Sequence, residues 1–138
     1  LLTMFAGLFV VVEGVERAGL TARWLAALPA GAHHAPLALA GVTTALSNVV
    51  SNVPAVLVLR GWVQHFADPG RAWLVLAMTS TLAGNLTLVG SVANLIVVEQ
   101  ARLDVRVGFW TYARTGLPLT LLTLALGLGW LVLATPAR

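Results

Sequence analysis

The sequence predicts an all-α polytopic membrane protein with three transmembrane spans, one of them broken at mid-depth, and one re-entrant helical hairpin. Three observations predict this class. Of the 138 residues, 59% are hydrophobic and 9% are charged, whereas a soluble domain carries about a quarter charged residues. The apolar residues form long runs that are separated by short polar connections. Two of these runs are interrupted by Asn, Ser, Gly or Pro.

The charge pattern excludes several classes of function. The net charge of +3 comes from single basic residues scattered between apolar runs, so no basic patch is present that could bind nucleic acid. Without cysteine, the chain cannot form disulfides or use a thiol nucleophile. Serine-hydrolase, Walker and dinucleotide-binding patterns are also missing. We therefore expect no enzymatic activity, no metal site and no organic cofactor.

The first half of the chain divides into two apolar segments. Residues 1–20 begin with an apolar run that is about half the roughly 20 residues needed to cross a bilayer, so we expect a truncated span and a chain that is part of a longer protein. Residues 36–63 are long enough to cross but are interrupted around residues 47–54. Each arm is about half a bilayer long, and Pro54 lacks an amide donor. The pattern favours a hairpin, or a helix broken at mid-depth, over one unbroken span.

The second half contains one interrupted span and one continuous span. Residues 72–100 are apolar but hold two glycines, Gly84 and Gly90, that lower helix propensity in the middle. Residues 102–114 carry three arginines and are expected to lie in the membrane interface. Residues 115–135 form the only uninterrupted span. We expect residues 1–138 to be a single membrane domain.

Tryptophan positions support these boundaries, because Trp prefers the headgroup layer of a membrane. Four of the five tryptophans lie close to arginines at the expected interfaces. They are Trp24 beside Arg23, Trp62 near Arg60, Trp73 near Arg71, and Trp110 between Arg106 and Arg114.

The two interruptions are the features that predict function. An unsatisfied backbone group in hydrocarbon costs several kcal/mol, so unwound chain persists there only beside protein or a water-filled cavity. Transporters commonly bind their substrate and coupling ion at such broken helices. Half-helix N-termini attract anions, and neutral oxygens can coordinate sodium. The expected substrate-binding residues are Ser47, Asn48, Ser51, Asn52, Asn85, Thr87, Ser91 and Asn94, and the expected structural breaks are Pro54, Gly84 and Gly90.

Simpler interpretations apply to several of these residues. Taken singly, each Ser, Thr or Asn more often bonds to a neighbouring helix than to a ligand; the joint occurrence of two breaks favours a site. His33 and His34 have no second cluster of ligands and are interpreted as interfacial rather than metal-binding. Glu99 is interpreted as the ion-pair partner of Arg102 at the membrane edge rather than as a proton carrier.

Two segments resemble the C-terminal half of the ion transporter superfamily, which includes arsenite permeases, citrate-type carriers and divalent-anion/sodium symporters. They are TTALSNVVSNVPAVLV at residues 43–58 and STLAGNLTLVGSVANLIVV at residues 80–98. The resemblance implies one half of an inverted-repeat transporter. It also implies a cation site at Asn48, Gly90, Ser91 and Asn94. Val49 replaces the threonine of the Ser-Asn-Thr tip found in dicarboxylate symporters, which disfavours a dicarboxylate substrate.

These observations together predict secondary active transport of a small anion. The anion is expected to bind between the hairpin tip and the broken helix, and its transport is expected to be coupled to a cation. Sodium is favoured over protons, because no carboxylate pair lies at membrane depth. The alternatives are an arsenite or antimonite efflux permease and a non-transporting membrane scaffold subunit. The expected partners are the lipid bilayer, the solute and the N-terminal half of the same transporter, with a homodimer left open. The expected location is a prokaryotic inner membrane.

Overall fold

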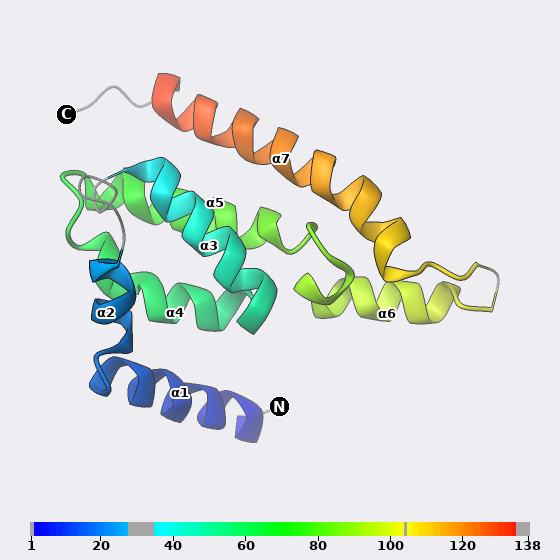
Figure 1. Cartoon of the computed structure of the whole chain (residues 1–138), viewed down its shortest axis with the longest axis horizontal. Helices are drawn as coiled ribbons and strands as arrows, with labels where there is room; N and C mark the ends of the chain where they lie inside the picture. The colour runs from blue at the N-terminus through cyan, green and yellow to red at the C-terminus, as the bar shows by residue number, and fades with distance from the viewer. Residues whose placement is uncertain (1, 28–34, 104, 135–138) are drawn as a thin grey trace.

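The computed structural model describes residues 2–27, 35–103 and 105–134, and within them the secondary structure is entirely helical (Figure 1). This agrees with the predicted all-α class. The pair His33–His34 lies outside the described residues. In chain order the elements are α1 (Leu2–Arg17), α2 (Leu20–Ala26), α3 (Pro36–Val50), α4 (Asn52–Val63), α5 (Pro69–Ala83), the 3-10 turn η2 (Leu88–Gly90), α6 (Val92–Ala101) and α7 (Phe109–Ala134).

Helices α3 and α4 form a hairpin whose turn is a single residue, Ser51. Pro36 begins α3, where its fixed φ suits a first helical turn and its missing donor is not needed. The chain reverses at Ser51, which has φ 75° and ψ 164°. This backbone region is nearly restricted to glycine and costs about 1–3 kcal/mol for other residues. With 15 and 12 residues, the two helices are about 22 and 18 Å long, so each is shorter than a bilayer core.

Helices α5 and α6 are separated by the non-α-helical residues 84–91. Asp68 caps the start of α5, because its carboxylate accepts a hydrogen bond from the Arg71 backbone amide at 3.0 Å. The helix ends at Ala83, and Ser91 then caps α6 by accepting from the Ala93 amide at 3.2 Å. The interruption therefore has a helix C-terminus on one side and a capped helix N-terminus on the other.

Helix α7 has 26 residues and is, among the described residues, the one helix long and apolar enough to cross a membrane by itself. It begins at Phe109, six residues before the boundary expected at residue 115. Residues 109–114 join the helix, whereas residues 105–108, which end in Gly108, are irregular. At the other end, the Arg71 guanidinium donates to the Leu131 carbonyl at 2.7 Å. This bond places a cation at the helix C-terminus, where it is favourable, and ties the end of α7 to the start of α5.

The buried core lies where α3, α4 and α5 pack together. It includes Leu39, Trp62 and Leu76, each at most 2% exposed. The Trp62 ring packs against Phe66 with ring centroids 5.9 Å apart. The expectation that Trp62 faces the headgroups is therefore wrong: its side chain is enclosed by the hairpin and α5. Trp110, in contrast, is 78% exposed.

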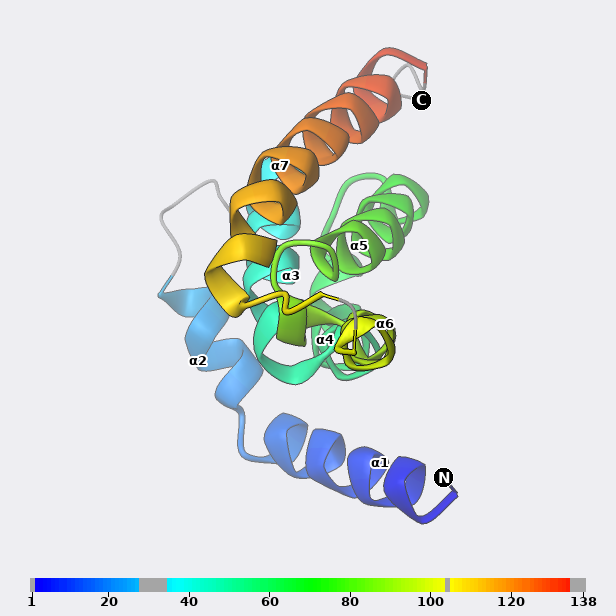
Figure 2. The same ribbon diagram turned by 90° about the vertical axis from the view of Figure 1, so that its right-hand side faces the viewer.

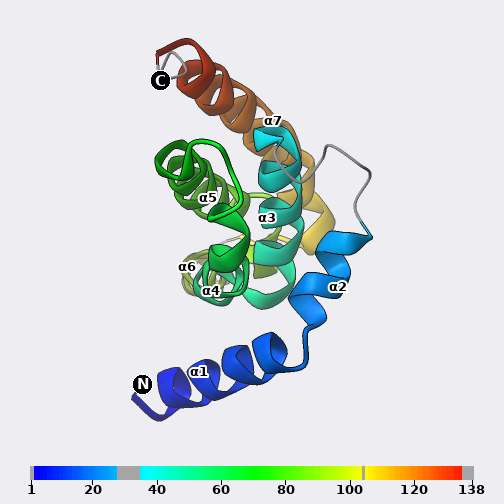
Figure 3. The ribbon, with the colours of Figure 1, turned by 90° about the vertical axis from the view of Figure 1, so that its left-hand side faces the viewer.

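Helices α1 and α7 lie on opposite sides of this core, as three views agree (Figures 1, 2 and 3). Helix α1 contacts α4. The Arg60 guanidinium makes two hydrogen bonds to the Glu16 carboxylate, at 2.9 and 3.2 Å. This exposed ion pair fastens α1 to the outer face of the hairpin and leaves the other face for α5 and the break.

Candidate functional site

Asn48 joins the two interruptions of the fold. Its side-chain nitrogen donates to the Thr44 carbonyl within α3 and to the Ala83 carbonyl at the end of α5, both at 2.9 Å. Its side-chain oxygen accepts from the Thr87 hydroxyl at 2.9 Å. One half-buried amide therefore connects the hairpin to both the last turn of α5 and the unwound segment after it. We call the cluster of Asn48, Thr87, Gly90 and Asn94 the junction.

Gly90 completes the junction because it leaves room for the Asn48 side chain. A Cβ atom at this position would lie 2.6 Å from the Asn48 side-chain oxygen and 3.1 Å from the Gly84 carbonyl oxygen. Neither neighbour can easily move: the Asn48 side chain is fixed by three hydrogen bonds, and the second atom belongs to the backbone. Glycine is the residue that permits this close approach.

Asn94 closes the interruption from the side of α6. Its side-chain nitrogen donates to the Gly84 carbonyl at 2.7 Å and, more weakly, to the Thr87 carbonyl at 3.4 Å. The Gly84 carbonyl follows the end of α5 and would otherwise lack a helical partner, whereas the Thr87 carbonyl also accepts from the Gly90 amide at 3.1 Å. The side-chain oxygen of Asn94 has no hydrogen-bond partner among the described residues. Asn94 thus stabilises the unwound chain with one end of its amide and keeps an acceptor at the other end.

Three polar side-chain atoms of the hairpin are buried without a hydrogen-bond partner among the described residues. They are the Thr44 hydroxyl within α3 and, nearer the tip, the Ser47 hydroxyl and the side-chain oxygen of Asn52. Ser47 is fully buried, one residue before Asn48, and Asn52 is the first residue of α4. A buried polar group without a partner costs about 1–3 kcal/mol. The two acceptors nearer the tip are the ones that a bound cation or solute donor would satisfy.

The N-terminal ends of α4 and α6 face each other across the junction. Figures 1 and 2 show the two helices nearly in line, with their early residues turned toward the break. The first amides of a helix have no intrahelical acceptor, and helix dipoles place partial positive charge at these ends. Ser91 satisfies one such amide in α6. Pro54 lies in the first turn of α4, where its lack of a donor does no harm.

A cavity of about 420 Å³ lies beside the interruption. Asn85 contributes from the unwound segment, and Thr111, Tyr112 and Thr115 contribute hydroxyl groups from the first turns of α7. The approach of the two elements depends on Gly116, since a Cβ there would meet the carbonyl oxygens of Asn85 and Leu86. The lining of this cavity is uncharged: an amide and three hydroxyl groups supply its polar part, and Val107 and Leu119 supply apolar surface.

The structure brings together only some of the residues expected at the site. Asn48, Thr87, Gly90 and Asn94 share the junction, with Gly84 supplying a carbonyl to it. Ser51 is exposed at the hairpin turn and Ser91 serves as a helix cap. Asn85 is exposed toward α7, away from the Asn48 side chain's hydrogen-bond partners.

Sequence reasoning missed the contribution of α7. Thr111, Tyr112 and Thr115 fall in or next to the stretch expected at the membrane interface, and neither they nor Gly116 are among the expected site residues. The available signal was weak: hydroxyl residues at positions i, i+1 and i+4, followed by a glycine, at the start of an apolar helix.

Comparison with known proteins gives the family. The family profile described as "Citrate transporter" matches residues 1–83. The chain is 42% identical over 142 residues to the silicon efflux transporter LSI3 of Oryza sativa subsp. japonica, which covers 93% of this chain and 29% of that protein. It is 39% identical over 140 residues to arsB of Dictyostelium discoideum, a protein named as a transporter, covering 96% of this chain and 25% of that protein.

A further relative is the 46 kDa membrane protein of Mycobacterium leprae, which is 30% identical over 137 residues, covering 91% of this chain and 32% of that protein. No solved structure matches the chain. The chain thus spans about a quarter to a third of the length of these relatives. With three fifths of its residues matched by the profile, the chain belongs to the citrate transporter family of integral membrane transporters and is not an enzyme.

Proposed function

We propose that the full-length protein carries out secondary active transport of a small anion and that the solute binds at the junction between the hairpin tip and the broken helix. The observation that carries this proposal is the meeting of two interrupted elements at Asn48, which bonds to the end of α5 and to Thr87. Unwound backbone within a membrane protein is favourable only where protein or a polar cavity satisfies it.

The helix lengths support a topology of three spans and one hairpin for this chain. Helices α5 and α6 contain 15 and 10 residues, which together extend about 37 Å and exceed the roughly 30 Å of a bilayer core. Helix α7 would return across the membrane, because the Arg71 guanidinium near the start of α5 donates to the Leu131 carbonyl near the end of α7. The first span is α1, and α3 with α4 enters and leaves on one side. The chain would be one half of an inverted-repeat transporter.

The polarity of the helix ends supports a negatively charged solute. The N-termini of α4 and α6 both face the junction (Figure 1), so their dipoles favour negative charge there. The hydrogen bonds that hold the junction use only amide, hydroxyl and backbone groups. Neutral donors of this kind can replace the hydration shell of a solute without desolvating a fixed charge.

A coupling cation would bind the acceptors that remain. The Ser47 hydroxyl, the Asn52 side-chain oxygen and the Asn94 side-chain oxygen are neutral oxygens of the type that sodium prefers in transporters with unwound helices. A cation beside the anion would offset its charge. In this mechanism the hairpin and α5–α7 move as a unit against the rest of the transporter and expose the site alternately to the two sides.

A second candidate is efflux of a neutral hydroxylated solute, such as arsenite or silicic acid. It is favoured by the uncharged lining of the cavity beside Asn85 and by the relative named as a silicon efflux transporter. Tyr112 and Thr111 offer hydroxyl groups that could exchange hydrogen bonds with such a solute.

Uptake into proteoliposomes distinguishes the two candidates. The full-length protein is reconstituted, and the fluxes of citrate, arsenite and silicic acid are measured with a sodium gradient, a proton gradient or none. We expect an anion to be accumulated when sodium is present outside and the flux to fall by about tenfold or more without it. Sodium-independent movement of a neutral solute would support efflux instead. If the folded protein moves none of the three solutes faster than protein-free vesicles do, the result contradicts both candidate functions.

A further inference from the structure

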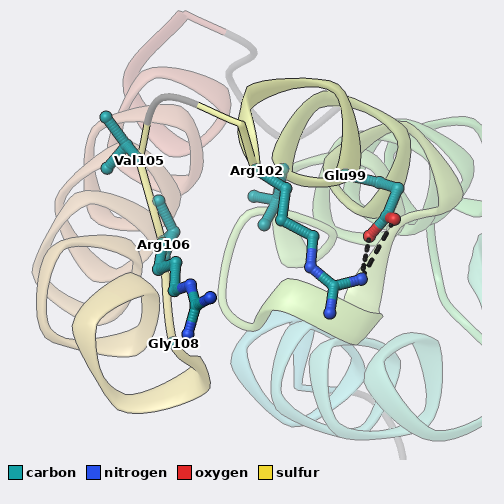
Figure 4. Close-up of a pocket in the computed structure, with 7 residues that line it drawn as sticks. Glu99, Arg102, Val105, Arg106 and Gly108 are labelled. Carbon is teal, nitrogen blue, oxygen red and sulfur yellow. Dashed lines mark hydrogen bonds and ion pairs between the residues drawn. The ribbon is translucent and has the colours of Figure 1, made fainter.

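A second polar cavity lies at the far end of α6, away from the junction. Its volume is about 320 Å³. It opens between the last turn of α6 and residues 105–108, which lead back to α7 (Figure 4). Glu99, Arg102 and Arg106 contribute the charged groups, and the remaining lining is Val98, Val105, Val107 and Gly108. Neither the junction nor the cavity beside Asn85 includes these charged residues.

The guanidinium groups in this cavity are available to an anion. Arg106 has no hydrogen bond or ion pair with any described residue. Arg102 contacts Glu99 at 3.2 Å, but both side chains are about 70% exposed, and exposed ion pairs of this kind contribute little. Figure 4 shows both arginines directed toward the same side of the gap. Over residues 99–114 the sequence holds three arginines against Glu99 and Asp104, which leaves one positive charge in excess.

Exposed apolar side chains lie close to the charged groups along the chain. Leu103 is 97% exposed, Trp110 is 78% exposed and Val105 is 57% exposed. Phe109 packs edge-on against Trp110 with ring centroids 5.4 Å apart. A free anion in water would gain nothing from these apolar side chains. A phospholipid would, because its phosphate can pair with arginine while its glycerol and upper acyl chains contact Trp and Leu at the headgroup level.

We propose that the cavity lined by Arg102 and Arg106 binds the phosphate of an anionic phospholipid in the leaflet at this end of α6. Arginine suits this role because its planar group can make two hydrogen bonds to phosphate oxygens. The bound lipid would fasten the loop between α6 and α7 to the membrane surface. This inference needs only a membrane-embedded chain and is independent of the identity of the transported solute.

Lipid-dependent thermal unfolding of the purified full-length protein tests the proposal. The protein in neutral detergent is titrated with phosphatidylglycerol, phosphatidylcholine or inorganic phosphate. We expect phosphatidylglycerol to raise the unfolding temperature and the other two to leave it nearly unchanged. The double substitution Arg102→Gln and Arg106→Gln should remove at least half of the rise. The matched control, Arg17→Gln and Arg23→Gln, removes the same amount of charge from other helices. This control should keep the full rise in unfolding temperature.

Three results would overturn the proposal. They are an equal rise in the double variant and the parent, an equal loss in the control, and a full rise produced by inorganic phosphate alone. If the double variant does not fold, Arg106→Gln alone carries the test, because this side chain has no described bond to lose. For that variant a rise equal to that of the parent is the contradicting result.

Discussion

Replacing Asn48 with alanine in the full-length transporter is expected to lower uptake per molecule by about an order of magnitude. The substitution removes three hydrogen bonds, two of which join the hairpin to Ala83 and Thr87. Hydrogen bonds between membrane helices contribute about 0.6 kcal/mol each on average, so the two that leave α3 together amount to about 1.2 kcal/mol. A loss of about 1.4 kcal/mol is a tenfold change in an equilibrium. The measurement is initial uptake of the transported solute, normalised to folded protein in the vesicle.

Thr81→Ala is the matched control for Asn48→Ala. The Thr81 hydroxyl is exposed and donates to the Ala77 carbonyl at 2.9 Å within α5. The Thr81→Ala protein therefore loses a hydrogen bond within α5, a neighbour of the Asn48 helix α3, without losing a bond of the junction, and uptake should stay within about twofold of the parent. If Asn48→Ala lowers expression but leaves uptake per folded molecule unchanged, Asn48 only locks helices together and does not serve the site.

Gly90→Ala is expected to have an effect at least as large, although it adds only one carbon atom. The new Cβ would meet the Asn48 side-chain oxygen at 2.6 Å and the Thr87 hydroxyl at 3.2 Å. Relief of this overlap must displace the two side chains whose hydrogen bond holds the junction. Overpacking of this kind typically costs about 1–3 kcal/mol. We expect a lower unfolding temperature in detergent and the loss of most uptake.

Gly129→Ala provides the comparison for Gly90→Ala. Gly129 lies in α7, and a Cβ there meets no atom within 4 Å. Alanine at a helical position of this kind is neutral or stabilises by about 0.5–1 kcal/mol. A Gly90→Ala protein as stable and as active as the Gly129→Ala protein would show that the close packing at the junction does not exist in the folded transporter.

The sequence was sufficient to predict where the helices break, because breaks leave a local signal. Pro54 and the glycines at positions 84 and 90 lower helix propensity at fixed positions, and the structure has α4 begin at Asn52 and η2 end at Gly90. The all-helical class followed from composition and from the length of the apolar runs. The family resemblance, based on residues 43–58 and 80–98, agrees with the profile that matches residues 1–83.

The partners of the polar side chains could not be predicted from the same pattern. Asn48 and Asn85 are both asparagines within an interruption, yet one has its amide fully engaged across two helices and the other is exposed beside α7. Their difference depends on long-range packing, which periodicity does not encode. The burial of Trp62 has the same origin. Its proximity to Arg60 in sequence suggested an interface, but the hairpin turns this ring into the core.

The most direct test of the proposed site is uptake by the Ser47→Ala protein. The Ser47 hydroxyl is buried and has no hydrogen-bond partner among the described residues, so its removal breaks no described bond and should not lower the unfolding temperature. If this oxygen binds the coupling cation or the solute, the concentration of sodium or solute needed for half-maximal uptake rises by about tenfold. Uptake with the parent's dependence on both concentrations, from a normally folded variant, would contradict the claim that the solute or its coupling cation binds at the hairpin tip beside the junction.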